Sequence, residues 1–529
     1  MKRITELVLI VVMVMLVSVG CGDTTEKSKT KPQAVTNLSK PDSTKWHYVE
    51  KYDIYYQTGI DYCEKPADEQ YEQLAVFVPG AYLDASDNGD GTYTCKVSES
   101  AELNGYSAAT APIMMPIETP GYAAAKALND EILMTHQGML EQLSYYTSQG
   151  FVFVLSGCRG TNEGAPTGVT DLKAAIRYIR YADDVIAGDA ESIFVYGMSG
   201  GGAQAAILGA SGDSELYTPY LEAIGAVQGV SDAVAGVMAW CPVTNLDTAN
   251  AEYEWMMGCT RPKRTDELNA ISDKLAHAYA DYVNSAGFTD ENGKPLTLTE
   301  SKEGIFQAGS YYDHVKGVIE TSLNHYLSDR DFTADSAQEY IDGLNTDKKW
   351  ISYDKRTNTA SITSIADFAK HCKTASDMPV AFDGLQGKHT LFGSGDGERS
   401  HFDRILADIL TELNSEYAAD FAADLVKANF VGHTVETRVN LYSPLFYLMK
   451  SREGYGTSNI AKYWRIRSGI EQKTNSLTTE INLALALKSC DKVDNVDFET
   501  VWAQDHTEAE RSGNSTENYI AWVNTCTKG

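Results

Sequence analysis

One short segment in the first half of the chain carries residues suited to nucleophilic chemistry. It reads Gly197-Met-Ser-Gly-Gly201 and fits the pattern Gly-x-Ser-x-Gly, with Ser199 at its centre. A buried run, Ser192-Ile-Phe-Val-Tyr196, precedes it, and a small-residue stretch that predicts a helix follows. This context is typical of a sharp strand-to-helix turn that presents a serine hydroxyl above the edge of a sheet. The sequence therefore predicts Ser199 to be a nucleophile near a helix N-terminus, where backbone N–H groups can hold a developing oxyanion.

The main alternative for this segment is a glycine-rich turn that packs closely or binds phosphate. The chain has no Gly-x4-Gly-Lys pattern, so a P-loop does not compete with the nucleophile.

A serine hydroxyl needs a general base, and in this type of turn the partners follow in the order serine, acid, histidine. His506 lies in a short loop after the predicted strand Val496–Val501, near the end of the chain. His401 and His433 come before the last two predicted strands. We therefore expect His506 to be the base.

The acid should follow the predicted strand Tyr463–Arg467. Glu471 is the only carboxylate in the loop after this strand, so we expect it to orient the imidazole. Asp491, Asp494 and Asp497 are alternatives, although they lie after the next predicted helix and are typical of a solvated turn.

The elements that must position these residues alternate between strands and helices. Buried strands are predicted over 73–79, 150–155, 192–196 and 237–240. A helix opened by Thr170 or Asp171 has an apolar face and a basic face that includes Lys173. This alternation indicates a parallel sheet.

The same pattern returns late in the chain, with a strand at 463–467, a helix at 477–488 and a strand at 496–501. The stretch 248–433 is instead helical and rich in tyrosine, without strong apolar strands. We expect an α/β-hydrolase fold, a mostly parallel sheet flanked by helices. Its core parts would span 46–247 and 434–529, with a large helical lid inserted at 248–433.

Composition and charge exclude some classes of partner, but they do not indicate the reaction. The 529 residues include 73 acidic and 44 basic side chains, which gives a formal net charge of −29. Such a surface repels phosphate backbones, so nucleic acid is not an expected partner. Eight cysteines besides Cys21 permit disulfides, but no Cys-x-x-Cys pattern predicts a zinc ribbon. Cys158 and Cys241 lie in apolar runs and are expected to be buried.

The N-terminus predicts export. Lys2 and Arg3 precede an apolar run, Leu7–Val19, that is short for a membrane span. It ends in Ser18-Val19-Gly20-Cys21, which resembles a bacterial lipobox with Ser18 where leucine is usual. We expect a signal peptide over 1–20, lipidation at Cys21 and a flexible tether over 21–45. The protein would then be extracytoplasmic and anchored to the bacterial cell membrane. An ordinary cleaved signal, with Cys21 incidental, is the alternative.

Several segments together resemble the bacterial tannase (subtype B) and feruloyl-esterase-like group. They are Val169–Arg180, Gly197–Ala203, Leu208–Asp213, Tyr217–Leu221, Cys241–Leu246, Ala251–Trp255, Leu391–Gly393 and Tyr463–Arg467. The resemblance runs from about Tyr52 onward. It implies hydrolysis of small-molecule esters of hydroxylated aromatic acids under a helical lid, with no metal or organic cofactor.

Carried onto this sequence, the resemblance implies that Ser199 is the nucleophile and His506 the base. Gly121, in Pro120-Gly121-Tyr122, falls where the family has a Gly-Gly-Tyr segment, so its N–H and that of Gly200 would form the oxyanion hole. Two departures stand in the acid loop. The family reads Gly-x-x-Asp-x-Asp there, and counting from Gly469 places Gln472 and Thr474 at the aspartate positions.

We therefore expect Glu471 to act from one residue earlier, its longer side chain absorbing the offset. The expected function is a serine carboxylic ester hydrolase acting on an ester of a phenolic acid. A serine peptidase of the prolyl-oligopeptidase type shares the order of the three residues and is the second hypothesis. The third is a catalytically inactive hydrolase fold that serves as a surface binding lipoprotein.

Overall fold

The computed structural model describes residues 34–135, 137–261, 265–373 and 387–528. The predicted signal peptide and Cys21 lie outside the described residues. Residues 34–529 form one compact unit, which the following paragraphs describe. None of its described helices is both long enough and apolar enough to cross a membrane.

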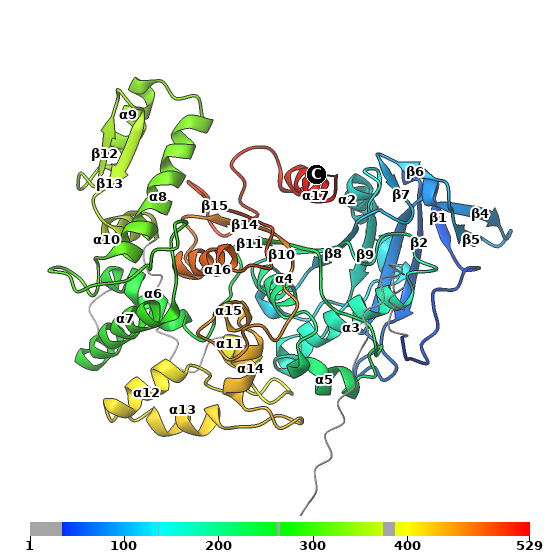
Figure 1. The fold of residues 1–529 in the computed structure, drawn as a ribbon, viewed down its shortest axis with the longest axis horizontal. Helices are drawn as coiled ribbons and strands as arrows, with labels where there is room; N and C mark the ends of the chain where they lie inside the picture. The colour runs from blue at the N-terminus through cyan, green and yellow to red at the C-terminus, as the bar shows by residue number, and fades with distance from the viewer. Residues whose placement is uncertain (1–33, 136, 262–264, 374–386, 529) are drawn as a thin grey trace, which may run out of the picture. The chain divides into compact units, whose positions relative to one another are not determined.

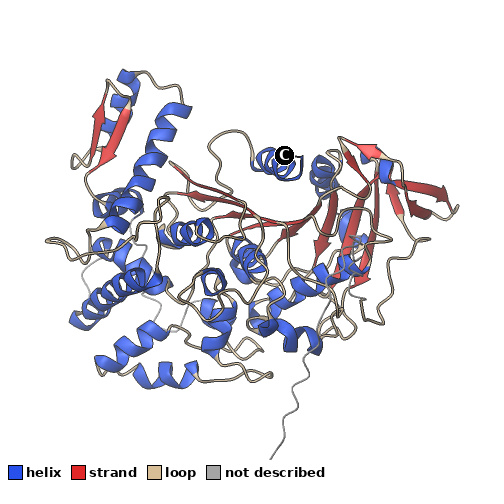
Figure 2. Ribbon diagram, viewed as in Figure 1, coloured by secondary structure: helices blue, strands red, loops and turns tan. Residues whose placement is uncertain are grey.

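The centre of this unit is a nine-stranded mixed sheet, ordered β1-β2-β3-β9-β8-β10-β11-β14-β15 (Figures 1 and 2). The strands span His47–Val49, Ile54–Asp61, Gln73–Pro79, Val152–Ser156, Ile113–Ile117, Ile193–Met198, Gly236–Trp240, Tyr463–Gly469 and Asn495–Val501, in that order. From β9 to β15 the neighbours are parallel, whereas β1, β2 and β3 pair antiparallel. The mostly parallel sheet predicted from the sequence is confirmed.

Helices cover both faces of the sheet, as Figure 1 shows. α4 (Gly200–Ala210) packs against β10 and β11, and α3 (Thr167–Tyr181) packs against α4. On the other face α17 (Ser515–Lys528) contacts β10 through ring contacts between Trp522 and Phe194 and between Tyr519 and Tyr196. The two sides of β10 are therefore both buried, as expected for a central parallel strand.

The remaining helices of the core surround these layers. They are α1 (Asp130–Thr135), α2 (Gln137–Thr147), α5 (Thr218–Ala223), α14 (Val435–Leu441), α15 (Pro444–Leu448) and α16 (Thr478–Lys488). Two small antiparallel hairpins, β4–β5 (Leu83–Asp87 and Tyr93–Val97) and β6–β7 (Glu102–Leu103 and Tyr106–Ser107), lie outside the main sheet.

The chain between β11 and β14 adds no described strand to the main sheet. It contains α6 (Ala249–Met257), α7 (Asp266–Ala286), α8 (Ser310–Asp329), α9 (Ala334–Leu344), α10 (Ile365–Phe368), α11 (Gly387–Leu391), α12 (Arg404–Glu412) and α13 (Ala418–Leu425) before the core helices α14 and α15. A separate hairpin, β12–β13 (Ile351–Asp354 and Thr359–Ile362), joins this helical part. Its helices contact the core at several places: α6 packs against α16, α8 packs against β15 and α13 packs against α14.

The structure corrects two details of the predicted helix at 170–180. α3 begins at Thr167 rather than at Thr170 or Asp171, because the Asp171 carboxylate does not cap the helix. It accepts instead from the backbone N–H and the guanidinium of Arg159, at 2.7 to 3.0 Å. Lys173 does not face solvent either: its fully buried ammonium donates to Asp232 at 2.7 Å.

Part of the predicted tether is held against the core. Val35 bridges to Gln228, and Ser39 accepts a hydrogen bond of 2.8 Å from the Tyr178 hydroxyl. Lys40 forms an ion pair with Asp184. Residues 34–45 are therefore not a flexible tether, because the core supplies partners for both their backbone and their side chains.

The cysteines other than Cys21 are all free thiols in the described chain, so none of them forms a disulfide there. Cys158 and Cys241 are buried, as their apolar surroundings predict.

Candidate active site

Ser199 lies on a strained turn between β10 and α4. Its backbone has φ 58° and ψ −119°, a conformation that costs a residue with a side chain of order 1–3 kcal/mol. The glycines around it leave the space that this turn needs. A Cβ added to Gly201 would lie 2.0 Å from the Ile117 carbonyl oxygen, and one added to Gly197 would lie 2.6 Å from the Gly201 carbonyl carbon. The pattern Gly-x-Ser-x-Gly is therefore required by close packing of β10, β8 and α4.

Two backbone N–H groups meet beside this serine. β8 runs into a 3₁₀ turn at Pro120–Tyr122, where Gly121 has φ 59° and ψ 22°. A Cβ added to Gly200 would lie 3.0 Å from the Gly121 nitrogen and 2.4 Å from the Tyr122 nitrogen, so the two chain segments touch. Gly200 is the first residue of α4, and the first N–H groups of a helix have no partner within it. The structure thus brings together the two glycines predicted to form an oxyanion hole.

His506 follows β15 and faces the same space. His506 and Ser199 line one cavity, although the hydrogen bonds of the structure do not join them directly. Burial lowers the pKa of His506 below its usual value, and the neighbouring Asp505 carboxylate offsets part of this effect. A lowered pKa keeps the imidazole neutral at pH 7, as a general base must be.

The acid loop differs from the prediction. The Nδ1 atom of His506 lies 2.8 Å from Oε1 of Gln472, which is fully buried. No hydrogen bond or ion pair joins Glu471 to His506 within the described chain. The backbone N–H of Glu471 donates to Gln504 at 3.0 Å, and burial raises the pKa of its side chain next to Asp505. The tight turn after β14 directs adjacent side chains apart, so residue 472 and not 471 reaches the imidazole.

The other candidates lie elsewhere. Asp497 pairs with Arg467 at 2.6 Å. His401 contacts Asp424 at 2.7 Å, and the His433 ring lies 3.0 Å from the Tyr220 hydroxyl. Each of these groups has a structural partner away from Ser199.

A buried polar network holds the Gln472 amide. Its Nε2 donates to Glu480 Oε1 at 2.6 Å and to Ser468 Oγ at 2.9 Å. Ser468 and Asn475 each donate to the same Glu480 oxygen at 2.9 Å. Glu480 stands in the first turn of α16 and is fully buried. Burial raises its pKa, while Asn475 and the buried cation of Lys373 act in the opposite direction.

The cavity that contains Ser199 and His506 has a volume of about 1110 Å³. The more buried part of its lining, called the floor, is aromatic and apolar, and the more exposed part, called the rim, is polar and carries carboxylates. The floor includes Phe153, Leu155, Tyr146, Tyr196, Met198 and Trp240, and the rim includes Glu118, Gln142, Gln149, Glu508, Asn514, Ser515, Thr516, Glu517 and Asn524. These rim residues come mainly from α2, α17 and the segment before α17, so the cavity opens between the two helices. An aromatic floor beside a nucleophile suits a substrate with a ring near its reacting carbonyl.

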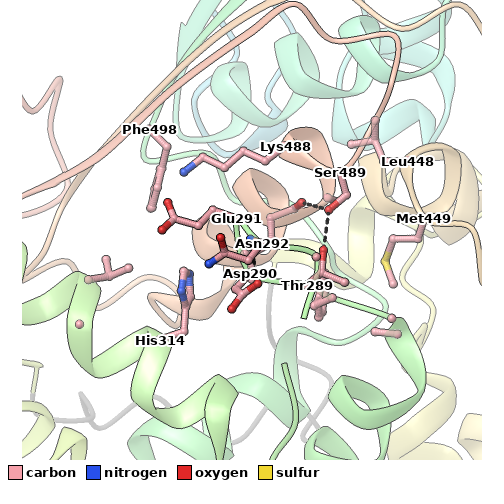
Figure 3. A pocket seen from close by; sticks show the side chains of 18 of the residues that line it. Thr289, Asp290, Glu291, Asn292, His314, Leu448, Met449, Lys488, Ser489 and Phe498 are labelled. Carbon is pink, nitrogen blue, oxygen red and sulfur yellow. Dashed lines mark hydrogen bonds between the residues drawn. The ribbon is translucent and has the colours of Figure 1, made fainter. Parts of the chain in front are cut away.

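A second cavity, of about 1120 Å³, contains neither Ser199 nor His506. Figure 3 shows Lys488 of α16 and His314 of α8 facing this space, next to Asp290, Glu291 and Asn292. Because Ser199 and His506 line only the first cavity of these two, we place the candidate active site there. No group of three or more His, Cys, Asp or Glu side chains in the described chain could hold a metal ion.

Comparisons with known proteins agree with this fold. A family model described as BD-FAE matches residues 107–303, which include the Ser199 turn and the Gly121 segment. The tannin acyl hydrolase of Lactobacillus plantarum superposes with a TM-score of 0.72 at 24% identity, covering 93% of this chain and 98% of that one. Fusobacterium nucleatum tannase gives 0.70 at 26% identity, with coverages of 90% and 95%.

A tannin acyl hydrolase in complex with ethyl gallate gives a TM-score of 0.69 at 24% identity, covering 89% of this chain and 94% of that one. No curated protein matches the sequence. The sheet order and these similarities lead to one conclusion: the chain has an α/β-hydrolase fold similar to that of the bacterial tannases, and the similarities support a carboxylic ester hydrolase.

Proposed function

We propose that the protein hydrolyses an ester of a phenolic acid through an acyl-enzyme formed on Ser199. The observation that carries this proposal is the strained Ser199 turn, set against the Gly121 and Gly200 N–H groups in one cavity with His506. Acyl transfer requires a hydroxyl, oxyanion donors and a base around one point, and the presence of these groups in one cavity supports the proposal.

The reaction proceeds in two balanced halves. Nε2 of His506 takes the proton of the Ser199 hydroxyl as its oxygen attacks the ester carbonyl carbon, and the Gly121 and Gly200 N–H groups receive the oxyanion. The carbon–oxygen bond to the alcohol then breaks, and the imidazolium returns its proton to the leaving oxygen. Water repeats the attack on the acyl-enzyme, which releases the acid and the free serine.

Two features support a phenolic acid as the acyl group. The floor of the cavity carries Tyr196 and Trp240 next to Ser199. Solved relatives include tannin acyl hydrolases in complex with 3,4-dihydroxybenzoate and with ethyl gallate. The carboxylates at the rim, Glu508 among them, favour a neutral ester over a free acid, so they also help the anionic product to leave.

A kinetic panel tests the proposal. Purified protein is assayed with methyl gallate, methyl ferulate, p-nitrophenyl acetate and a proline-containing dipeptide amide, alongside Ser199→Ala. We expect the aromatic methyl esters to be cleaved, the dipeptide amide to be untouched and the variant to lose at least three orders of magnitude in turnover. Cleavage of the peptide alone would replace the proposal with a serine peptidase.

The structure gives one specific observation in favour of a catalytically inactive binding protein, namely an amide at the position of the acid. A fluorophosphonate probe separates the two hypotheses, because it labels a serine only where a base activates it. Labelling at Ser199 supports the enzyme, and a folded protein without any labelling supports the binding protein.

We further propose that Cys21 carries a lipid that anchors the protein to the outside of the cell membrane. The support is the sequence alone: a basic start, an apolar run and the segment Ser18–Cys21. Mass spectrometry of the N-terminal peptide should find a diacylglyceryl adduct on Cys21. Cys21→Ser should move the protein from the membrane fraction to the soluble fraction, and an unmodified Cys21 in membranes would contradict the proposal.

A further inference from the structure

We propose that the third member of the triad is the neutral amide of Gln472, and that the buried side chain of Glu480 acts as a positioning residue that fixes this amide. The inference rests on the proposed function for its catalytic meaning, but the orientation of the amide can be measured without any substrate. It assigns to Gln472 and Glu480 the task that an ionised carboxylate performs alone in a serine, histidine and aspartate triad.

The network leaves the amide one orientation. An amide has two donors on nitrogen and an acceptor on oxygen, and here the nitrogen faces Glu480 and Ser468. The Ser468 hydroxyl donates its only hydrogen to Glu480, so towards Gln472 it can only accept a hydrogen bond. If the amide turned over, its oxygen would face the Glu480 oxygen at 2.6 Å without a hydrogen between them. Burial of all three side chains makes that contact costly, because no water can intervene.

This orientation decides the tautomer of His506. The Gln472 oxygen can only accept, so Nδ1 of His506, at 2.8 Å, must carry a hydrogen. In the neutral imidazole Nε2 then carries no hydrogen, and its lone pair can take the Ser199 proton. An amide in the opposite orientation would donate to Nδ1, and the hydrogen would move to Nε2. The imidazole would then be unable to act as a base towards the serine.

The amide differs from a carboxylate in charge. It supplies a dipole but no full negative charge beside the imidazolium that forms during the reaction. In agreement, burial lowers the pKa of His506, and the carboxylate that opposes this effect is Asp505 and not a triad acid. The carboxylate of Glu480 is separated from the imidazole by the amide group of Gln472, whose nitrogen faces Glu480 and whose oxygen faces His506. We therefore expect correct geometry, with less stabilisation of the imidazolium than an aspartate would give.

The direct test is the tautomer of His506, read from the ¹⁵N shifts of labelled histidine and assigned with His506→Gln. The parent protein should show hydrogen on Nδ1 at neutral pH. Glu480→Leu removes the acceptor and should give a mixture or Nε2–H, with at least a tenfold loss of kcat and little change in KM. Glu480→Gln keeps an oxygen acceptor, so it should retain the Nδ1 tautomer and a kcat between those of the other two proteins.

A matched control comes from Glu252 of α6, a second fully buried carboxyl that contacts the start of α16 through Thr478 and Thr479. Glu252→Leu disturbs the same helix without touching Gln472, and it should leave the His506 tautomer unchanged. If it alters the tautomer as much as Glu480→Leu does, the effect is general loosening of α16 and the inference is wrong.

Exchanging the amide of Gln472 and the carboxyl of Glu480 tests the effect of a negative charge next to His506. In the double variant Gln472→Glu with Glu480→Gln, an amide donates to a carboxylate that now touches His506. The acid limb of the kcat/KM profile should move to a pH at least one unit higher, and kcat should rise. An unchanged limb would overturn the inference. Should Glu480→Leu fail to fold, the parent tautomer and the double variant decide alone.

These readouts separate the inference from the proposed function. A parent protein with the Nδ1 tautomer that cleaves no ester would leave the amide network intact and refute the proposed function. Ester cleavage that depends on Ser199 in a protein with the Nε2 tautomer would support the proposed function and refute the inference about the amide.

Discussion

Replacing Gly200 by alanine should damage catalysis by moving the oxyanion hole, without unfolding the protein. The new Cβ would lie 2.4 Å from the Tyr122 nitrogen, 2.5 Å from the Thr119 oxygen and 3.0 Å from the Gly121 nitrogen. Ordinary contacts at these atoms begin near 3.4 Å, so the turn must retreat by about 1 Å. A displacement of that size costs about 100-fold in rate, and loss of one oxyanion donor costs about 2.7–4 kcal/mol of transition-state stabilisation.

The assay is the steady-state hydrolysis of methyl gallate or another aromatic ester that the parent cleaves. We expect kcat to fall about 100-fold or more while KM changes little, because the donors act mainly on the transition state. Gly317→Ala is the matched control, since a Cβ there meets nothing within 4 Å inside α8 and should stabilise the helix by about 1 kcal/mol. A folded Gly200→Ala protein with the parent kcat would refute the assigned oxyanion hole.

Three further predictions follow from buried charges. Burial lowers the pKa of His506 below 6.5, and its neutral form is the active one. We therefore expect kcat/KM to fall as the pH drops through a value below 6.5. An acid limb of the kcat/KM profile above pH 6.5 in the parent would contradict this. Asp232→Asn should lower the free energy of unfolding by about 3–5 kcal/mol in urea denaturation, because it leaves the buried Lys173 ammonium without its counterion. Asp184→Asn, at an exposed pair, should cost less than about 1 kcal/mol. Folding raises the pKa of the Glu252 side chain from its usual 4.5 to about 8. Between these two pH values the folded protein holds a proton that the unfolded chain has lost. The free energy of unfolding therefore falls as the pH rises through that window. The Gln side chain of Glu252→Gln cannot ionise, so the variant should be more stable than the parent by more than ~1 kcal/mol at pH 8 but not at pH 4.5. An equal difference in stability at both pH values would contradict the raised pKa of Glu252.

The strained turn at Ser199 could be predicted from sequence because its signal is local. Glycines at 197, 200 and 201 flank Ser199 between a β-branched run and a small-residue helix, and each has a contact in the structure that a Cβ would break. By contrast β8 could not be predicted, since Pro116 stands inside it and proline is unusual in a central strand. In the structure β8 nevertheless pairs parallel with β9 on one side and β10 on the other.

The third triad position could not be predicted for two reasons. Sequence reasoning sought an ionisable group after β14 and so selected Glu471, whereas in the structure the amide of Gln472 contacts His506. The carboxyl that orients this amide, Glu480, lies eight residues later at the start of α16, and nothing in the sequence pairs a turn with that position. Lys173 illustrates the same limit, because helical periodicity places it on a basic face but cannot show that Asp232 covers that face.

Trapping the acyl-enzyme is the most direct measurement of whether Ser199 is the nucleophile. The protein is mixed with an aromatic ester, quenched in acid within milliseconds to seconds, digested and examined by mass spectrometry. We expect a transient acyl adduct on the peptide that contains Ser199, and none with Ser199→Ala. Turnover of the ester without an adduct on that peptide, or turnover that persists in Ser199→Ala, would contradict it.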